Sequence, residues 1–270
     1  MRSLCQAVNI TISDRLFGKY ASEEELRQRN FGGVFYSFRL LPDLSLDKNH
    51  AFETLETLSK TTLDVRLHCP FFKTIELAHQ RDDIASHSCQ VLKHGLEIGA
   101  HFGLCSQTIH IGLGWENEKY LSWERAKYNL SALVEYGNHL GVTVTLENLP
   151  YGYTSDPVKF LELLQSSGAS AAVDFGHINA SRWGKEHAPE DFFEPIKPYL
   201  HEAHIYETER TDPKTGSPFH VAPQSGDILN PMLDCLWKTN CNWWHIELDD
   251  QAEVEHTQRL LQKYLRQHTT

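Results

Sequence analysis

The chain has 270 residues, which is enough for one large α/β domain. Hydrophobic residues make up 40% and charged residues 23% of it, as is usual for a globular protein with a sizeable core. The net charge of −11 argues against a broad basic surface for nucleic acid or anionic membrane. No run of 18 apolar residues is present, and the first residues are too polar for a secretory signal. Together with six cysteines that lack CxxC spacing, this predicts a cytoplasmic protein without a membrane span.

Strand-like runs alternate with amphipathic helical patterns along the chain. The first helix begins after Ser22, and Glu25 completes a capping-box pattern. Gly141 and Gly168 end two later helices. Residues 208–227 are rich in Pro, Gly, Ser and Thr, which predicts a long loop over one face of the domain. The predicted strands are residues 3–10, 32–40, 63–69, 107–112, 142–148, 169–176, 201–207 and 242–248.

Eight strands that alternate with helices and have no linker between them predict a single (β/α)8 TIM barrel over residues 1–270. A doubly wound open sheet is the structural alternative. Neither a GxGxxG nor a GxxxxGK[ST] motif is present to support nucleotide binding in such a sheet.

Six consecutive predicted strands, the third to the eighth, end in an imidazole or a carboxylate. Taken singly, each of these residues is an ordinary structural histidine or a helix cap. In a barrel, however, the strand ends meet around one axis, and so many buried ionisable groups are costly without a shared partner. We therefore predict a divalent cation there. The residues are His68, His110, Glu147, Asp174 with His177, His204 and Glu247, and His220 follows in the loop after the seventh strand.

Four motifs at these strand ends resemble those of the xylose-isomerase-like TIM barrel superfamily, namely LENLP, VDFGH, AHIYE and HIELD. The resemblance implies one divalent metal ion (Mn, Zn, Co or Mg). It also implies a small-molecule substrate, a sugar or sugar phosphate, bound by a monomer or homo-oligomer. The implied metal ligands are Glu147, Asp174, His204 and Glu247, and the implied substrate-binding residues are His68, His110, Asn148, His177 and Arg210.

The chemistry implied by this resemblance is proton transfer next to a carbonyl, as in a sugar isomerase or epimerase. The metal would stabilise an enediolate. Glu147 and Glu247 would be the catalytic residues on opposite sides of the substrate.

The superfamily also includes the endonuclease IV type, in which three zinc ions hydrolyse a phosphodiester. On this alternative His68, His110, His177 and His220 are additional metal ligands. Pro218 stands where that type has an aspartate, and the acidic net charge argues against nucleic acid. A barrel that binds a ligand without catalysis is a third alternative.

Overall fold

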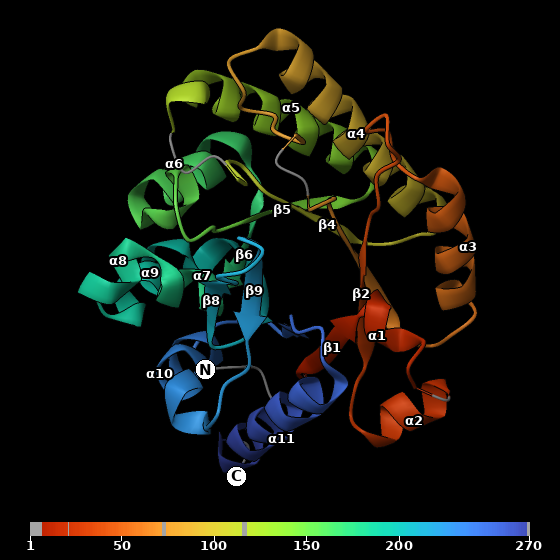
Figure 1. Ribbon diagram of the computed structural model, residues 1–270, viewed down its shortest axis with the longest axis vertical. Coiled ribbons are helices and arrows are strands. Elements are labelled where there is room, and N and C mark those ends of the chain that lie inside the picture. Colours follow the sequence, from red (N-terminus) through yellow and green to blue (C-terminus); the bar gives the residue numbers. More distant parts are fainter. Residues whose placement is uncertain (1–6, 21, 72–73, 115–117, 269–270) are drawn as a thin grey trace.

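The computed structural model describes the chain except for residues 1–6, 21, 72–73, 115–117 and 269–270 (Figure 1). Within the described residues, eight parallel strands close into a barrel in the order β1-β10-β7-β6-β5-β4-β3-β2. This confirms the predicted TIM barrel. In chain order the barrel strands are β1 (Asn9–Ser13), β2 (Gly33–Ser37), β3 (Asp64–His68), β4 (Ser106–Ile109), β5 (Thr143–Glu147), β6 (Ser170–Asp174), β7 (Leu200–Ile205) and β10 (Trp243–Ile246).

Helices surround the barrel (Figure 1). None of the helices in the described residues combines the length and hydropathy needed to cross a membrane. The longer helices are α3 (Lys48–Ser59), α4 (Asp82–His101), α5 (Trp123–Leu140), α6 (Pro157–Ser167), α9 (Pro189–Ile196), α10 (Gly226–Trp237) and α11 (Gln251–His268). The short ones are α1 (Asp14–Phe17), α2 (Glu23–Gln28), α7 (Phe175–Ala180), α8 (Arg182–Glu186) and the 3-10 turns η1 (Glu118–Tyr120), η2 (Tyr153–Ser155) and η3 (Lys197–Tyr199).

Helix ends follow the local sequence signals. The Ser22 side chain accepts a hydrogen bond from the backbone N–H of Glu25 at the start of α2. Gly141 and Gly168 end α5 and α6 with φ of +76° each, a conformation that glycine adopts without strain. Asp156 caps α6 by accepting from two backbone N–H groups. These ends fix where the following strands enter the barrel.

The barrel interior carries a buried ion pair beneath the strand ends. Arg66 Nη1 donates to Glu202 Oε2 over 2.9 Å, and the Thr108 hydroxyl donates to the other oxygen of Glu202. The Arg66 guanidinium lies 4.3 Å from the Trp243 ring. Since the two charges are paired and hydrogen-bonded, they can be buried at this depth.

The first strand begins later than predicted. The sequence predicted residues 3–10, of which 3–6 lie outside the described residues, but β1 runs from Asn9 to Ser13. Ile10 and Ile12 of β1 are buried in the hydrophobic core. The strand therefore lies over the run of consecutive β-branched residues, Ile10, Thr11 and Ile12.

The predicted loop over residues 208–227 is instead an ordered hairpin followed by the start of α10. Strands β8 (Thr208–Thr211) and β9 (Pro218–Val221) pair antiparallel, with Glu209 opposite His220. The turn passes through Gly216 at φ +70°. Strand propensity of Thr, Phe and Val outweighs the turn-like composition here.

Candidate metal centre

The barrel brings together the four residues that resemble a metal site, from β5, β6 and β7 and the residue after β10. One ligand atom each of Glu147, Asp174, His204 and Glu247 lies within 4.8 Å of all the others. We call these residues the four-residue centre. Asp174 and His204 are fully buried, and Glu147 is 1% exposed.

Several polar atoms of the four-residue centre are buried without a hydrogen-bond partner, namely Asp174 Oδ2, His204 Nδ1 and Glu247 Oε2. They still face one another, because His204 Nδ1 lies 3.2 Å from Glu147 Oε2 and 3.0 Å from Glu247 Oε2. Unsatisfied buried polar atoms are costly. Three carboxylates and an imidazole suit a divalent cation such as Zn²⁺ or Mn²⁺, which would satisfy these atoms together.

The electrostatics of the four-residue centre also favour the binding of a cation. Burial opposes ionisation of Glu147, but His204 holds the pKa of that carboxyl well below its ordinary value. Burial raises the pKa of Asp174 to about 7, and Glu147 adds to the shift. The pKa of His204 lies well above its ordinary value although burial opposes the shift, because Glu147 and Glu247 face the ring. A bound cation would replace the protons that the site otherwise holds.

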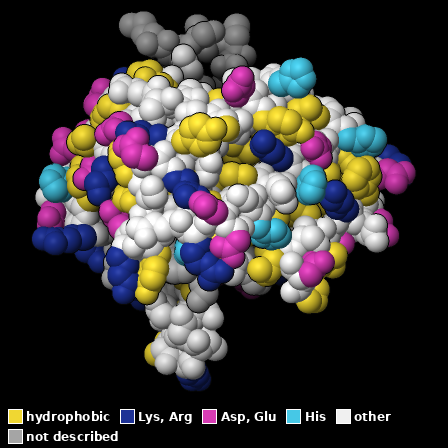
Figure 2. All heavy atoms as spheres, turned by 90° about the horizontal axis from the view of Figure 1, so that it is seen from above, with side chains coloured by type: hydrophobic (Ala, Val, Ile, Leu, Met, Phe, Trp, Pro, Cys, Tyr) yellow, Lys and Arg dark blue, Asp and Glu magenta, His cyan; other side chains and the backbone are white. Residues whose placement is uncertain are grey.

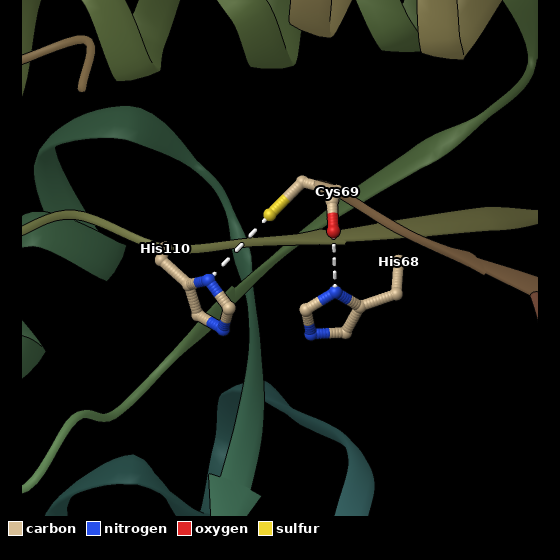
Figure 3. A group of neighbouring side chains, drawn as sticks. All are labelled: His68, Cys69 and His110. Carbon is tan, nitrogen blue, oxygen red and sulfur yellow. Dashed lines mark hydrogen bonds between the residues drawn. The ribbon is translucent and has the colours of Figure 1, made fainter. Parts of the chain in front are cut away.

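A pair of histidines, His68 and His110, contacts the same carboxylate. The Nε2 atom of each lies 3.2 Å from Glu147 Oε2. Behind them, His68 Nδ1 donates to the backbone oxygen of Cys69 over 2.7 Å, and His110 Nδ1 lies 3.6 Å from Cys69 Sγ (Figure 3). Although burial opposes these shifts, Cys69 and Glu147 raise the pKa of His68 to about 10 and that of His110 to about 9.

A third group, which we call the hairpin group, consists of His177, Glu209 and His220. His177 Nε2 and His220 Nε2 lie 3.6 and 3.9 Å from Glu209 Oε2. Their Nδ1 atoms donate to the backbone oxygens of Asn148 and Glu247, each over 2.8 Å. Because carbonyl oxygens only accept, both imidazoles direct Nε2 at the carboxylate, as metal-binding histidines do.

Two residues of these groups, Cys69 and Glu209, were not predicted from the sequence. Pro218 supplies no carboxylate, but Glu209 lies opposite His220 in the hairpin and close to both histidines. The alternation of side chains along a strand would have indicated it, had the hairpin been recognised. Cys69 was predicted only as an ordinary reduced thiol, and no motif marked it.

Arg210 and Asn148 do not face the cavity above the centre. Arg210 is exposed, whereas its neighbours Glu209 and Thr211 line the cavity. The Asn148 amide accepts from the backbone N–H of Asp174 over 2.7 Å and donates to its oxygen over 3.2 Å. It thereby ties β5 to β6, and substrate binding by either residue stays a prediction.

A cavity of about 550 Å³ opens above the four-residue centre. Histidines 110, 177 and 220 and Glu247 line it, as do the partly exposed rings of Phe71 and Phe219. Among its described lining residues, Arg15 is the one Lys or Arg side chain, and its Nη1 lies 3.4 Å from Asp249 Oδ1. The described wall is therefore not strongly basic.

A closed barrel with buried histidines and carboxylates at its strand ends defines a TIM barrel with a candidate metal site. The chain belongs to the xylose isomerase-like TIM barrel family, whose sequence profile matches residues 24–267. A segment of 160 residues is 32% identical to the uncharacterised protein MJ0008 of Methanocaldococcus jannaschii. That segment covers 58% of this chain and 66%, slightly less than two thirds, of MJ0008.

Solved structures show the same fold. A D-tagatose 3-epimerase-like protein aligns with a TM-score of 0.70 and 17% identity, over 96% of this chain and 97% of that one. Endonuclease IV of Thermus thermophilus aligns with a TM-score of 0.67 and 13% identity, over 96% of this chain and 99% of that one. At such identities the likeness establishes the fold alone.

Proposed function

We propose that the protein is a divalent-metal-dependent sugar isomerase or epimerase. The observation that carries this proposal is the four-residue centre, in which Asp174 Oδ2, His204 Nδ1 and Glu247 Oε2 are buried without a hydrogen-bond partner and Glu247 lines a cavity. Zn²⁺, Mn²⁺, Co²⁺ or Mg²⁺ would suit these ligands. The structural likeness to a D-tagatose 3-epimerase-like protein supports a sugar as substrate.

Among the carboxylates of the four-residue centre, Glu247 is best placed to take a proton from a bound sugar, because it is the one that lines the cavity. Burial opposes its ionisation, but His204 holds the pKa of Glu247 below its ordinary value. The group is therefore ionised at neutral pH and can accept a proton. A divalent cation would supply the positive charge that stabilises an oxyanion next to the carbon that loses the proton. Glu147, which also belongs to the four-residue centre, is the second acid/base candidate.

The cavity wall suits a neutral polyhydroxylated substrate. His177 lines the cavity and presents its Nε2 atom, which can hydrogen-bond to a hydroxyl group. Phe71 and Phe219, 39% and 46% exposed, offer apolar faces to the C–H groups of a sugar. Because Arg15 is already close to Asp249, the described wall favours a sugar over a sugar phosphate.

The test combines metal analysis with proton exchange. Protein purified without a His tag is analysed for metal and then incubated in D2O with ketoses, their phosphates and a model phosphodiester. Wild-type protein should contain metal and exchange solvent deuterium into a sugar. Glu247→Gln should slow this exchange by about 10²–10⁴-fold. Glu253→Gln, an exposed carboxylate on α11, is the matched control and should react normally. Absence of metal, or turnover of the phosphodiester alone, would refute the proposal.

A metal-dependent phosphodiester hydrolase is the second candidate function. It is favoured by the histidine pair and the hairpin group, which could hold cations beyond the first. The net charge of −11 argues against a nucleic-acid substrate, and on the face in Figure 2 the described Lys and Arg side chains are interspersed with Asp and Glu. Turnover of the phosphodiester, together with two or three metal ions per chain of which one is lost in Glu209→Gln, would favour hydrolysis over isomerisation.

A further inference from the structure

Four histidines around the centre, His68, His110, His177 and His220, have similar surroundings. Each directs one ring nitrogen at a carboxylate while a neighbouring group contacts the other nitrogen. For three of them this group is a backbone oxygen, which can only accept, so Nδ1 carries a proton and Nε2 is the atom that faces the carboxylate. These three pairs are His68 with Cys69, His177 with Asn148 and His220 with Glu247.

His110 differs, because a side chain contacts it from behind. Its Nδ1 lies 3.6 Å from Cys69 Sγ, while its Nε2 lies 3.2 Å from Glu147 Oε2. Cys69 therefore touches both histidines of the pair, His68 through its backbone oxygen and His110 through its sulfur (Figure 3). It can do so because it directly follows β3 and its own N–H donates to the Thr108 oxygen over 2.8 Å. Cys69 is 3% exposed, so water does not compete strongly for these contacts.

The direction of the contact between His110 and the sulfur decides what His110 can bind. If His110 Nδ1–H donates to the sulfur, Nε2 of the neutral ring keeps its lone pair and can bind a cation in place of a proton. If the thiol S–H donates to Nδ1, Nε2 of the neutral ring carries the proton and cannot be a metal ligand. The backbone contact already imposes the first arrangement on His68, and both rings face the same oxygen of Glu147.

We propose that Cys69 is a positioning residue, whose sulfur accepts the His110 Nδ1–H and leaves Nε2 free to bind a cation shared with Glu147. The inference rests on the metal centre of the proposed function. His68, Cys69 and His110 lie close enough together to hold an ion themselves. For a cation shared with Glu147, however, Cys69 is not a ligand, because its sulfur contacts the ring nitrogen of His110 that does not face Glu147. The Cys69 sulfur thus orients the ring of His110, as the Cys69 backbone oxygen orients the ring of His68.

The test compares zinc affinity in three variants, measured by competition with a chromophoric chelator. Cys69→Ala removes the acceptor and should weaken binding by about 10–100-fold, as is usual when a group behind a metal-binding histidine is lost. Cys69→Ser keeps an acceptor and should restore most of the affinity. Cys235→Ala removes a buried thiol of α10 and should bind zinc as the wild type does. ¹⁵N NMR of zinc-loaded, histidine-labelled protein should show His110 bound through Nε2.

Equal zinc affinity in the wild type and Cys69→Ala would overturn the inference. A sulfur-to-cobalt charge-transfer band in the Co²⁺-loaded wild type would also overturn it, because Cys69 would then be a ligand. Circular dichroism checks that each variant folds. If Cys69→Ala does not fold, the zinc affinity of Cys69→Ser serves as the test. Zinc binding without turnover of any sugar would refute the proposed activity but leave the role of Cys69 intact.

Discussion

Replacing Glu202 by Gln should lower the free energy of unfolding by about 3–5 kcal/mol at pH 7. Glu202 is fully buried, and the change leaves the Arg66 guanidinium, 10% exposed, without its counter-charge. Removing one partner of a buried ion pair usually costs this amount. The pKa of Glu202 gives an independent estimate. Burial opposes ionisation, but His204 and Arg66 lower this pKa from 4.5 to about 2, which corresponds to about 3 kcal/mol.

The pH dependence of this difference has a definite sign. Because folding lowers the pKa of Glu202, its carboxylate stabilises the folded protein above about pH 4.5, and this stabilisation is lost as the pH falls towards 2. Urea unfolding of chelator-treated wild type and Glu202→Gln, followed by circular dichroism, should therefore show a large gap at pH 7 that narrows below pH 4.5. Glu56→Gln, an exposed residue of α3, should change stability by less than about 0.5 kcal/mol.

Two results would refute this reasoning about Glu202. Equal stability of Glu202→Gln and the wild type at pH 7 would mean that the pair with Arg66 contributes nothing. A gap that stays constant well below pH 4.5 would mean that the lost stability comes from packing and not from charge. A double variant, Arg66→Met with Glu202→Leu, should lose less than the single change, because no unpaired charge stays buried.

Three further predictions concern the metal and the packing around it. Chelation should lower the melting temperature, and zinc should restore it, since a ligand at 100 times its Kd stabilises by about 2.7 kcal/mol; an unchanged melting temperature would contradict a metal site. Zinc affinity should rise at least about tenfold from pH 6 to pH 7 in competition titrations, because two ligands must lose protons to bind: Asp174, whose pKa is about 7, and His204, whose pKa lies well above its ordinary value. A flat profile would contradict this. Gly176→Ala should lower the free energy of unfolding by about 1–3 kcal/mol in urea melts, because its added Cβ would overlap the Tyr206 ring, and wild-type stability would contradict that packing.

The sequence was sufficient to predict the barrel and the ionisable residues at its strand ends, because both follow from patterns of neighbouring residues. Apolar and β-branched runs mark the strands, and parallel strands in a barrel bring their last residues to one end. These patterns grouped the ionisable residues at six strand ends, and the resemblance to the family selected Glu147, Asp174, His204 and Glu247 among them.

What the sequence did not predict depends on contacts between distant residues. Cys69 matters only because His110, 41 residues later, lies beside it. Glu209 joins two histidines through the register of an unpredicted hairpin. Arg66 and Glu202 are 136 residues apart in the sequence, and neither residue by itself indicates that it forms a buried ion pair. Such roles follow from three-dimensional pairing and have no local signal.

The pairing of β1 with β10, which closes the barrel, has a consequence for how the chain folds during synthesis. Strand β1 pairs with β10, and the Thr11 hydroxyl lies 3.1 Å from His245 Nδ1, 234 residues further along the chain. On the ribosome, β1 must therefore wait with one unpaired edge until almost the whole chain has emerged. Glu247 follows directly after this last strand, so the four-residue centre is incomplete until the barrel closes. Tight metal capture should thus mark the end of folding, and a chain truncated before β10 should expose two strand edges to aggregation.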